Sequence, residues 1–504
     1  MKKIQFPIII LIFFTVAFTS CKKYLDINTN PNAIPASNPP IAQLLTNAQI
    51  NQAFINGGDL YRYSALIVQH LSGQASQPNQ TYEYGRFNIT GSDQNNLWST
   101  IYATVLNDLE IIIQTAKAGG SPHYSGVAKV LKAFQYQETI DTYGDIPYSE
   151  TQLQVANRNP KYDKAEDTYK TLINLLTEAI TEVNATTSNL SPGSNSLSYT
   201  SSNFASVKAN WVKLANVLKL RILLHYSKKD PAFMVAQMNA LIASGGPFFT
   251  SNADNFQVKF VDAPNARNPI HAFELSRANY LFADQKLVSL MNSKNDPRRA
   301  SYFTPFPYNS SPATYKGVSP GDASNVNYSR MHTYLRGAVS GTATPNSAGG
   351  INATALTYTG DAPIRMITYH EYCFIRAEAA LRGVGTLADA QLWFTNGIAA
   401  SMQLAGVSET AVAAYLTLNG LLVGTTNEQI KQVIEEKYVS LYGVAVEPWT
   451  DYRRTGFPIL TSPSNAVETA IPRSLFYPQS EIDLNTSVPG QKANLQSRIF
   501  WDTP

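Results

Sequence analysis

The sequence has few cysteines and few charged side chains for its length. Two cysteines in 504 residues exclude a disulfide framework and leave too few thiols for a zinc cluster. Charged residues make up 15% of the chain, compared with about 25% in ordinary soluble domains. The 39 basic and 36 acidic side chains leave a net charge of +3, without the clustered excess of Lys and Arg that nucleic acid binding requires. We therefore expect no nucleic acid partner.

The motifs of common enzyme families are also absent. The chain contains no P-loop, no dinucleotide-binding glycine fingerprint, no zinc-protease helix and no nucleophile elbow. Its six histidines are scattered, and His370-Glu371 lacks the second histidine that a zinc site needs. His225 follows an apolar helical stripe, which favours a surface or capping residue over a general base. The sequence predicts neither a metal nor a cofactor.

What the chain does contain is apolar residues and uncharged polar ones. Hydrophobic residues make up 44% of the sequence, enough to bury a large core and to exclude wholesale disorder. With so few charges, much of the surface must consist of Asn, Gln, Ser, Thr and the hydroxyl groups of 28 tyrosines. Such a surface gives little long-range attraction to a charged partner and suits an uncharged ligand held at short range.

The first 40 residues have the pattern of an export and anchoring segment. Two lysines precede an apolar run over residues 4–18, which is too short for a good membrane span and fits a signal-peptide core. The string Phe-Thr-Ser-Cys that ends at Cys21 resembles a bacterial lipobox, in which the cysteine is lipidated and begins the mature protein. We predict a lipoprotein-type signal peptide at 1–20, a tether at 21–40 and membrane attachment through the lipid on Cys21. The alternative is an ordinary secretory signal with an incidental cysteine.

Helical periodicity dominates the rest of the chain. Apolar residues repeat at three and four positions from Trp98 to Ile112, and the pattern stops at Gly119-Gly120. Asp163 is expected to cap a later helix, with Glu166 in capping-box spacing. Further helices are predicted from about residue 127, over 163–183, 211–227, 231–245, 366–382, 388–404 and 428–442.

Residues 247 to about 365 differ from both flanks, because they are dense in Pro, Gly, Asn, Ser and Tyr. We predict a mainly α fold in one domain over 41–504, with helical parts at about 41–246 and 366–450 around this loop-rich insert. Long ordered loops of this kind are usually functional. The helix pair separated by Gly383–Gly385 resembles tetratricopeptide architecture, and Cys373 lies in its apolar stripe as a predicted inert core thiol. The tail from residue 451 is predicted to be irregular.

Two carboxylates form a pair that glycoside hydrolysis would require. Asp141 and Asp145 flank Tyr143-Gly144, and Gly144 and Pro147 end any helix at this point. Both aspartates are better explained as turn residues that accept hydrogen bonds from nearby backbone N–H groups. An extracellular glycoside hydrolase that uses Asp141 or Asp145 is the less favoured hypothesis.

Other charged residues suggest structural contacts. Glu371 and Glu378 share one predicted helix with two arginines, and we expect ion pairs between packed helices. Arg453 and Arg454 would suit an anion, but a better explanation is that they lock the tail to the helical body by bidentate and stacking contacts.

Aromatic residues mixed with amides in two loop regions are the clearest sign of function. Sugar rings present apolar faces and hydroxyl edges, so a glycan site combines exposed aromatic rings with neutral hydrogen-bonding groups. For Trp98 core packing is equally favoured, and for a single loop tyrosine it is favoured over ligand contact. The candidate ligand residues are Gln74, Gln77, Tyr82, Tyr84, Asn96 and Trp98 in the first region, and Asn279, Tyr280, Tyr308 and Tyr328 in the second.

Several strings, taken in order along the chain, resemble those of one protein family. They are the twelve residues from Cys21, Tyr143–Tyr148 (Tyr-Gly-Asp-Ile-Pro-Tyr), Trp211–Arg221, Asn295–Arg298 (Asn-Asp-Pro-Arg), Phe374–Gly383, Glu447–Gly456, Ile471–Arg473 and Tyr477-Pro478. In this order they are similar to the SusD/RagB family of outer-membrane lipoproteins of the Bacteroidetes. The resemblance runs from Cys21 to Phe500-Trp501-Asp502.

This resemblance implies a body of tetratricopeptide-like helix pairs with a loop-rich second part. It also implies display on the outer face of the outer membrane, beside a TonB-dependent barrel of the SusC type. Members of the family capture oligosaccharide, or in some cases peptide, and deliver it to the barrel as a hinged lid; they are not enzymes. The shared strings are scaffold positions, so the resemblance assigns no ligand residue. A helical-repeat scaffold that holds other surface proteins is a further hypothesis.

Overall fold

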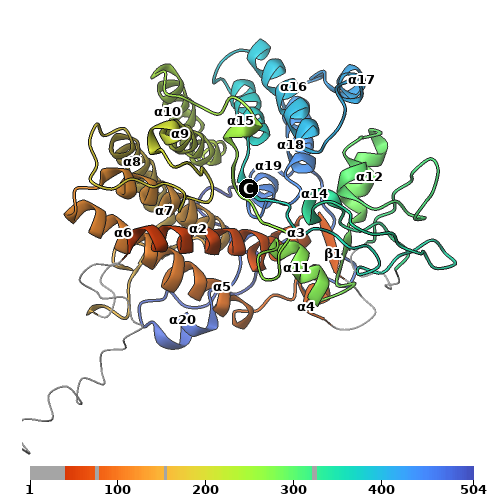
Figure 1. The fold of residues 1–504 in the computed structure, drawn as a ribbon, viewed down its shortest axis with the longest axis horizontal. Coiled ribbons are helices and arrows are strands. Elements are labelled where there is room, and N and C mark those ends of the chain that lie inside the picture. Colours follow the sequence, from red (N-terminus) through yellow and green to blue (C-terminus); the bar gives the residue numbers. More distant parts are fainter. Residues whose placement is uncertain (1–39, 74–78, 152–155, 320–325) are drawn as a thin grey trace, which may run out of the picture. The chain divides into compact units, whose positions relative to one another are not determined.

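The computed structural model describes residues 40–73, 79–151, 156–319 and 326–504 (Figure 1). The predicted signal peptide, the tether, Cys21, Gln74 and Gln77 lie outside these residues. Residues 41–504 form one compact unit, built mainly from helices with few and short strands. The prediction of a mainly α, tetratricopeptide-like fold is confirmed.

Helices form nearly all of the first half. Trp98, Ile101, Val105, Leu109 and Ile112 are buried along three consecutive elements, so the predicted stripe is confirmed. Helix α7 packs against α6 and α8, and α8 packs against α9. The elements are α2 (Ile41–Gly57), α3 (Asp59–Ile67), α4 (Gln80–Gly85), α5 (Asn95–Ser99), the π-helix η2 (Thr100–Leu106), α6 (Asn107–Ala118), α7 (Pro122–Tyr143), α8 (Ala165–Val183), α9 (Lys208–His225) and α10 (Pro231–Ala243).

The insert is irregular, as predicted, and contains only short elements. These are β4 (Phe256–Val258), α11 (Pro269–Ser276), β5 (Leu281–Ala283), α12 (Gln285–Ser293), α13 (Arg299–Tyr302), α14 (Thr333–Arg336) and β6 (Ile364–Ile367). Among the described residues the strands form three antiparallel pairs. Strand β4 pairs with β6, β2 (Ile146–Pro147) with β3 (Tyr162–Asp163), and β5 with β1 (Leu71–Gly73).

The C-terminal part returns to helices. They are α15 (Tyr369–Leu381), α16 (Leu387–Leu404), α17 (Glu409–Asn419), α18 (Thr426–Ser440), α19 (Glu447–Thr455) and α20 (Gln479–Leu484). The helix predicted from residue 366 begins at Tyr369, because the preceding apolar residues belong to β6. Helix α17 was not predicted, and α20 interrupts the tail that was predicted to be irregular. Cys373 is buried, and burial raises the pKa of its thiol to about 12, as expected of an inert core cysteine.

The predicted cap of helix α8 is wrong. Asp163 belongs to β3, and its carboxylate accepts hydrogen bonds from the backbone N–H groups of Tyr148 and Ser149 at 3.0 and 2.7 Å. The first N–H group of α8, that of Ala165, donates instead to Asp145 at 2.8 Å. A residue twenty positions upstream therefore satisfies this helix end, which local spacing does not reveal.

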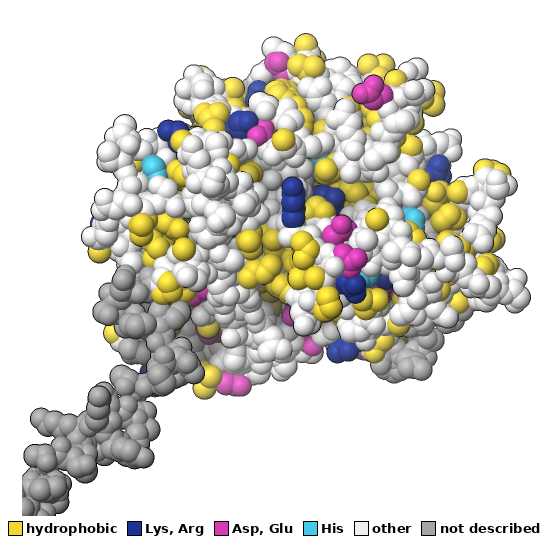
Figure 2. Space-filling view, in the orientation of Figure 1, with side chains coloured by type: hydrophobic (Ala, Val, Ile, Leu, Met, Phe, Trp, Pro, Cys, Tyr) yellow, Lys and Arg dark blue, Asp and Glu magenta, His cyan; other side chains and the backbone are white. Residues whose placement is uncertain are grey.

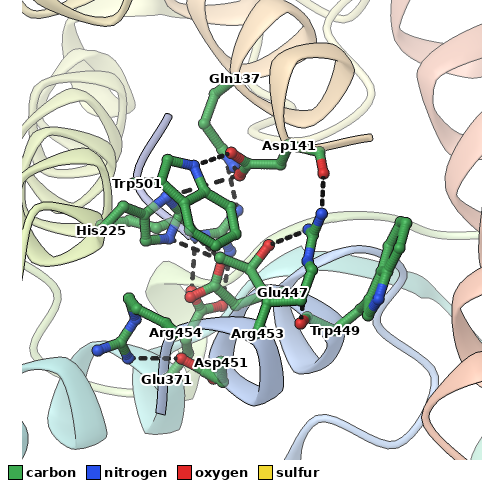
Figure 3. Close-up of polar contacts among 12 residues, drawn as sticks. Gln137, Asp141, His225, Glu371, Glu447, Trp449, Asp451, Arg453, Arg454 and Trp501 are labelled. Atoms are coloured by element: carbon green, nitrogen blue, oxygen red, sulfur yellow. Dashed lines mark hydrogen bonds and ion pairs between the residues drawn. The ribbon is translucent and has the colours of Figure 1, made fainter. Parts of the chain in front are cut away.

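A buried network of ion pairs joins helices from distant parts of the chain (Figure 3). Arg221 of α9 donates to Glu371 of α15 at 2.7 Å, and both side chains are almost inaccessible to solvent. Lys437 of α18 lies 2.8 Å from carboxylate oxygens of both Glu447 and Asp451 in α19. Because these pairs link separate helices, they fix how the helices sit against one another.

A second part of the same network confirms the predicted roles of two neighbouring arginines. Arg454 of α19 pairs with Glu378 of α15 through both of its terminal nitrogens. Arg453 lies over the rings of Trp449 and Trp501, at 3.8 and 4.8 Å from their centroids. The end of the chain is thereby held to the helical body.

Glu378→Gln should destabilise the fold by about 3–5 kcal/mol near neutral pH, because Arg454 then lacks its main anionic partner. Burial alone would raise the pKa of Glu378, but the charges of Arg454 and Arg382 lower it to about 2. Stabilisation by this carboxylate is therefore complete above its unfolded pKa of 4.5 and is lost as the pH falls toward 2. In urea unfolding experiments, the difference in unfolding free energy between wild type and variant should be constant from about pH 7 to about pH 4.5 and should narrow as the pH falls further toward about 3.

Glu178→Gln is the matched control. Glu178 pairs with Lys129, but its side chain is 63% exposed, so its loss should cost less than about 1 kcal/mol. An equal loss of unfolding free energy in the Glu378 and Glu178 variants would contradict a special role for the buried Glu378–Arg454 pair.

Candidate functional site

The structure places the described candidate ligand residues in several surroundings. Tyr82, Tyr280, Tyr308 and Tyr328 are half-buried, so part of each side chain reaches solvent. Asn279 is also half-buried, and Asn96 is exposed on α5. Tyr84 and Trp98 are core residues with 2% and 5% of their surface exposed.

Pairing of β1 with β5 brings the two aromatic loop regions together. Gly73 lies opposite Leu281, and Leu71 lies opposite Ala283. The Thr81 hydroxyl at the start of α4 donates to the Tyr280 carbonyl at 2.6 Å. We call this region the β1–β5 junction; it comprises β1, α4 and residues 279–284, 315–319 and 326–330.

Two further segments of the insert complete the β1–β5 junction. The Ala283 backbone accepts a hydrogen bond from the Val318 N–H at 3.0 Å and donates one to the Ser329 carbonyl at 3.2 Å. Ser329 in turn donates its N–H to the Lys316 carbonyl at 2.8 Å. Segments separated by more than 200 positions in the sequence thus form one connected surface region.

Cationic side chains lie against the aromatic rings of the junction. The Lys316 ammonium is 4.7 Å from the centroid of the Tyr328 ring, and the Arg86 guanidinium is 5.9 Å from that of Tyr82. The Tyr82 hydroxyl accepts a hydrogen bond from the Asn465 amide at 3.1 Å. Rings, amides and hydroxyls in this combination suit the apolar faces and hydroxyl edges of sugars.

Sequence reasoning missed both of these cations. Arg86 lies four positions after Tyr82, and that spacing on a short helix could have indicated the contact. Lys316 gave no such signal, because only the path of the insert brings it to Tyr328.

Three candidate residues instead support the fold around the junction. The Tyr84 hydroxyl donates to the Asp93 carboxylate at 3.1 Å and packs against Tyr63. Asn279 has a left-handed backbone with φ of 65°, and its side chain accepts a hydrogen bond from the Ala353 N–H at 2.9 Å. Tyr308 packs against a small apolar cluster within the insert. Their described contacts hold loops in place.

Trp98 lines a hollow of about 590 Å³, whose walls come from α5, η2, α6, α7, the loop after β2 and Glu481 of α20. Its ring lies 4.5 Å from that of Tyr102 and is stacked with that of Tyr162 at 6.3 Å. A buried ion pair between Lys132 and Glu110, at 2.7 Å, lines the same hollow. The described lining includes no residue of the β1–β5 junction, so Trp98 belongs to another part of the surface.

The carboxylates weighed for hydrolysis are engaged in structural contacts, and Figure 3 shows those of Asp141. Asp141 is fully buried, and it accepts hydrogen bonds from the Trp501 indole N–H at 2.9 Å and from the Tyr169 hydroxyl. Asp145 accepts from the backbone at the start of α8 and pairs with Lys164. The turn interpretation is therefore wrong for both residues. Asp145 accepts a backbone N–H, but from Ala165 twenty positions away, and Asp141 bonds mainly to side chains of the core.

The surface position predicted for His225 is wrong. Its side chain is fully buried at the end of α9, 3.4 Å from the Glu447 carboxylate and 3.0 Å from the Tyr169 hydroxyl. The apolar residues before it continue to face the core, so the histidine follows them inward. Its partners come from other helices, which the local sequence does not show.

Within the described ranges, no group of three or more His, Cys, Asp or Glu side chains is arranged to hold a metal ion. No helix in the same residues is long and apolar enough to cross a membrane. Figure 2 shows a face of the molecule on which charged side chains are sparse and scattered, in keeping with the low charge of the sequence.

The sequence matches a SusD-like family model over residues 31–478, a family described as starch-binding and associating with the outer membrane. The chain belongs to the SusD-like family. Members of this family are binding proteins. No curated protein shows significant sequence similarity to this chain.

Solved structures with the same fold include three informative relatives. A chitin-binding protein is 24% identical, with a TM-score of 0.73 over 91% of this chain and 100% of that one. A SusD homologue from Bacteroides fragilis is 21% identical, with a TM-score of 0.73 over 92% and 100% of the two chains. A chitin-binding SusD homologue from Flavobacterium johnsoniae is 21% identical, with a TM-score of 0.71 over 92% and 98%.

Gly73→Ala should disrupt the β1–β5 junction. A Cβ atom on Gly73 would lie 2.0 Å from the Thr81 carbonyl oxygen, so β1 and α4 would have to separate. We expect a loss of about 1–3 kcal/mol in unfolding free energy and faster amide exchange in β1 and β5.

Gly85→Ala is the control for this substitution. Its nearest new contact would be an ordinary 3.5 Å, and alanine favours helix, so neither stability nor exchange should suffer. Equal exchange rates in β1 for the two variants would show that the close approach at Gly73 is unimportant.

Proposed function

We propose that this SusD-like chain binds oligosaccharide at the cell surface and delivers it to a partner TonB-dependent barrel of the SusC type. The observation that carries the proposal is the β1–β5 junction, where backbone pairing joins the two distant regions that carry the half-buried side chains of Tyr82 and Tyr280. Sugars are held by stacking on such rings and by neutral donors and acceptors around them. Membership of a family described as starch-binding supports the same ligand class.

The proposed ligand is a neutral oligosaccharide. The chain is nearly neutral overall, and its junction offers tyrosine rings and hydroxyls rather than clustered carboxylates. Two structural relatives are described as chitin-binding, so chito-oligosaccharides are the first ligands to test. The described contacts do not require a bound cofactor.

The protein acts in this proposal by binding and not by catalysis. A glycosidase needs two carboxyl groups within reach of one glycosidic bond. Asp141 is covered by Trp501 and Tyr169, so a polysaccharide has no path to it. Asp145 already accepts the helix-start N–H of Ala165 and pairs with Lys164.

The proposed location is the outer face of the outer membrane, with a lipid on Cys21 as the anchor. The chain would leave the membrane through the 21–40 tether, and the described part begins at residue 40. Several acyl chains on one cysteine give stable attachment, whereas a single chain holds only marginally.

Tyr82→Ala and Tyr280→Ala should each weaken glycan binding by about tenfold, because each removes one ring from the junction. Isothermal titration calorimetry with chito-oligosaccharides, malto-oligosaccharides and a set of peptides measures the effect. Phe54→Ala is the control, since Phe54 lies on α2 with 44% of its surface exposed and is not part of the junction. Binding of peptides with no response to any glycan would contradict the proposed ligand class.

Cys21→Ser should abolish lipid attachment. Cells that express the wild-type chain and are fed a clickable palmitate analogue should yield a labelled protein in the outer-membrane fraction. The variant should be unlabelled and lost from that fraction, while Cys373→Ser should behave as wild type because Cys373 is buried. Labelling of the Cys21 variant would contradict the lipid anchor.

A further inference from the structure

A second pocket, of about 260 Å³, lies where the end of α16 meets the insert. Its walls come from α13, α14, the start of β6 and the last turn of α16, and they include Arg365 of β6. The described lining contains no Asp or Glu, so Arg365 is its charged residue. No residue of the β1–β5 junction belongs to this lining.

Arg365 is buried without a counter-ion. Only 7% of its surface is exposed, and no carboxylate within the described residues lies within 4 Å of its guanidinium. Several other buried arginines of this chain are neutralised, for example Arg221 by Glu371 and Arg454 by Glu378. An unpaired buried charge is costly, so a position of this kind favours an anion from solution.

Part of the Arg365 guanidinium is left without an acceptor from the protein. Its Nη1 donates to the Tyr334 carbonyl at 3.2 Å, and the group lies 4.0 Å from the centroid of the Tyr334 ring. Its Nε is buried without an acceptor. Nη2 has no acceptor among the described residues and is not fully buried, so it is the nitrogen that can donate to an anion in the pocket.

Two other buried arginines have no carboxylate partner among the described residues, and both differ from Arg365. Arg336 donates to His271 Nδ1 at 3.3 Å and to the Ala353 carbonyl at 3.2 Å, and it does not line this pocket. Arg453 is also buried without a carboxylate in direct contact, but its nitrogens donate to the carbonyls of Trp449, Asp141 and Arg473 and to the Thr450 hydroxyl. Arg453 is therefore satisfied by the protein itself. Arg365 has a single such acceptor.

We propose that this Arg365 pocket binds a small oxyanion such as a carboxylate, with one oxygen of the anion on Nη2 of Arg365. The pocket volume suits a molecule no larger than a single acidic sugar. This site is separate from the proposed glycan site. The two proposals are therefore tested by separate measurements, and neither depends on the other.

The test is thermal unfolding together with calorimetry of the full chain at constant ionic strength. Sodium glucuronate and sodium acetate represent carboxylates, sodium sulfate and sodium phosphate represent other oxyanions, and glucose is the neutral comparison. We expect a saturable rise in melting temperature with the carboxylates and none with glucose, because a ligand that binds only the folded state stabilises it. If sulfate or phosphate raises the melting temperature more than both carboxylates do, the ligand is an oxyanion of another class and the carboxylate is ruled out.

Two variants and one control test whether Arg365 is responsible for anion binding. Arg365→Met should weaken anion binding by about tenfold or more, as expected for loss of charge-assisted hydrogen bonds. Ala338→Leu keeps the arginine but fills the exposed side of the pocket, so it should also lose binding while folding normally. Arg376→Met is the matched control and should leave anion binding unchanged. Arg376 also lies against an aromatic ring and bonds to a tyrosine hydroxyl, but it is outside the pocket.

Unchanged anion binding in both Arg365→Met and Ala338→Leu would overturn the proposal. So would the absence of a saturable response to every oxyanion in the wild-type chain. If the wild-type chain binds anions but no chito-oligosaccharide, only the glycan site proposed at the β1–β5 junction is contradicted.

Discussion

Helices α9, α15, α18 and α19 meet around a network of charges that water does not reach. Its members are Arg221, Glu371, Glu378, Lys437, Glu447, Asp451 and Arg454. Burying each of these groups alone would cost several kcal/mol, so each is tolerated only because its partner stands at the correct distance. The network therefore specifies the arrangement of the helices: a shift of one helix would leave a charge unpaired.

This rigid body allows the insert to be irregular. Loops need fixed ends and internal hydrogen bonds if they are to hold a defined surface. The insert gains both from the β1–β5 pairing and from the bonds between Ala283, Val318 and Ser329. The junction is therefore held together largely by backbone hydrogen bonds.

The sequence predicted elements whose information is local. The stripe from Trp98 to Ile112 and the loop-rich insert both depend on spacing or composition within a local stretch of the chain. The sequence predicted that Arg454 makes a bidentate contact that holds the tail. It could not identify Glu378 as the partner, because Glu378 is distant in the sequence. Asp163 and His225 were misassigned because their contacts come from residues that are distant in the sequence.

The sequence by itself determined the helical character, the low charge and the composition of the surface, and it carries the family strings. These properties depend on periodicity and residue type, which a linear chain expresses directly. Only the tertiary structure decided that Tyr82 and Tyr280 belong to one region, that Trp98 lies in another, and that Arg365 lacks an anion. Such facts depend on which distant segments of the chain come into contact, and on which charges then have no partner. The spacing of residues within one segment carries no information on either.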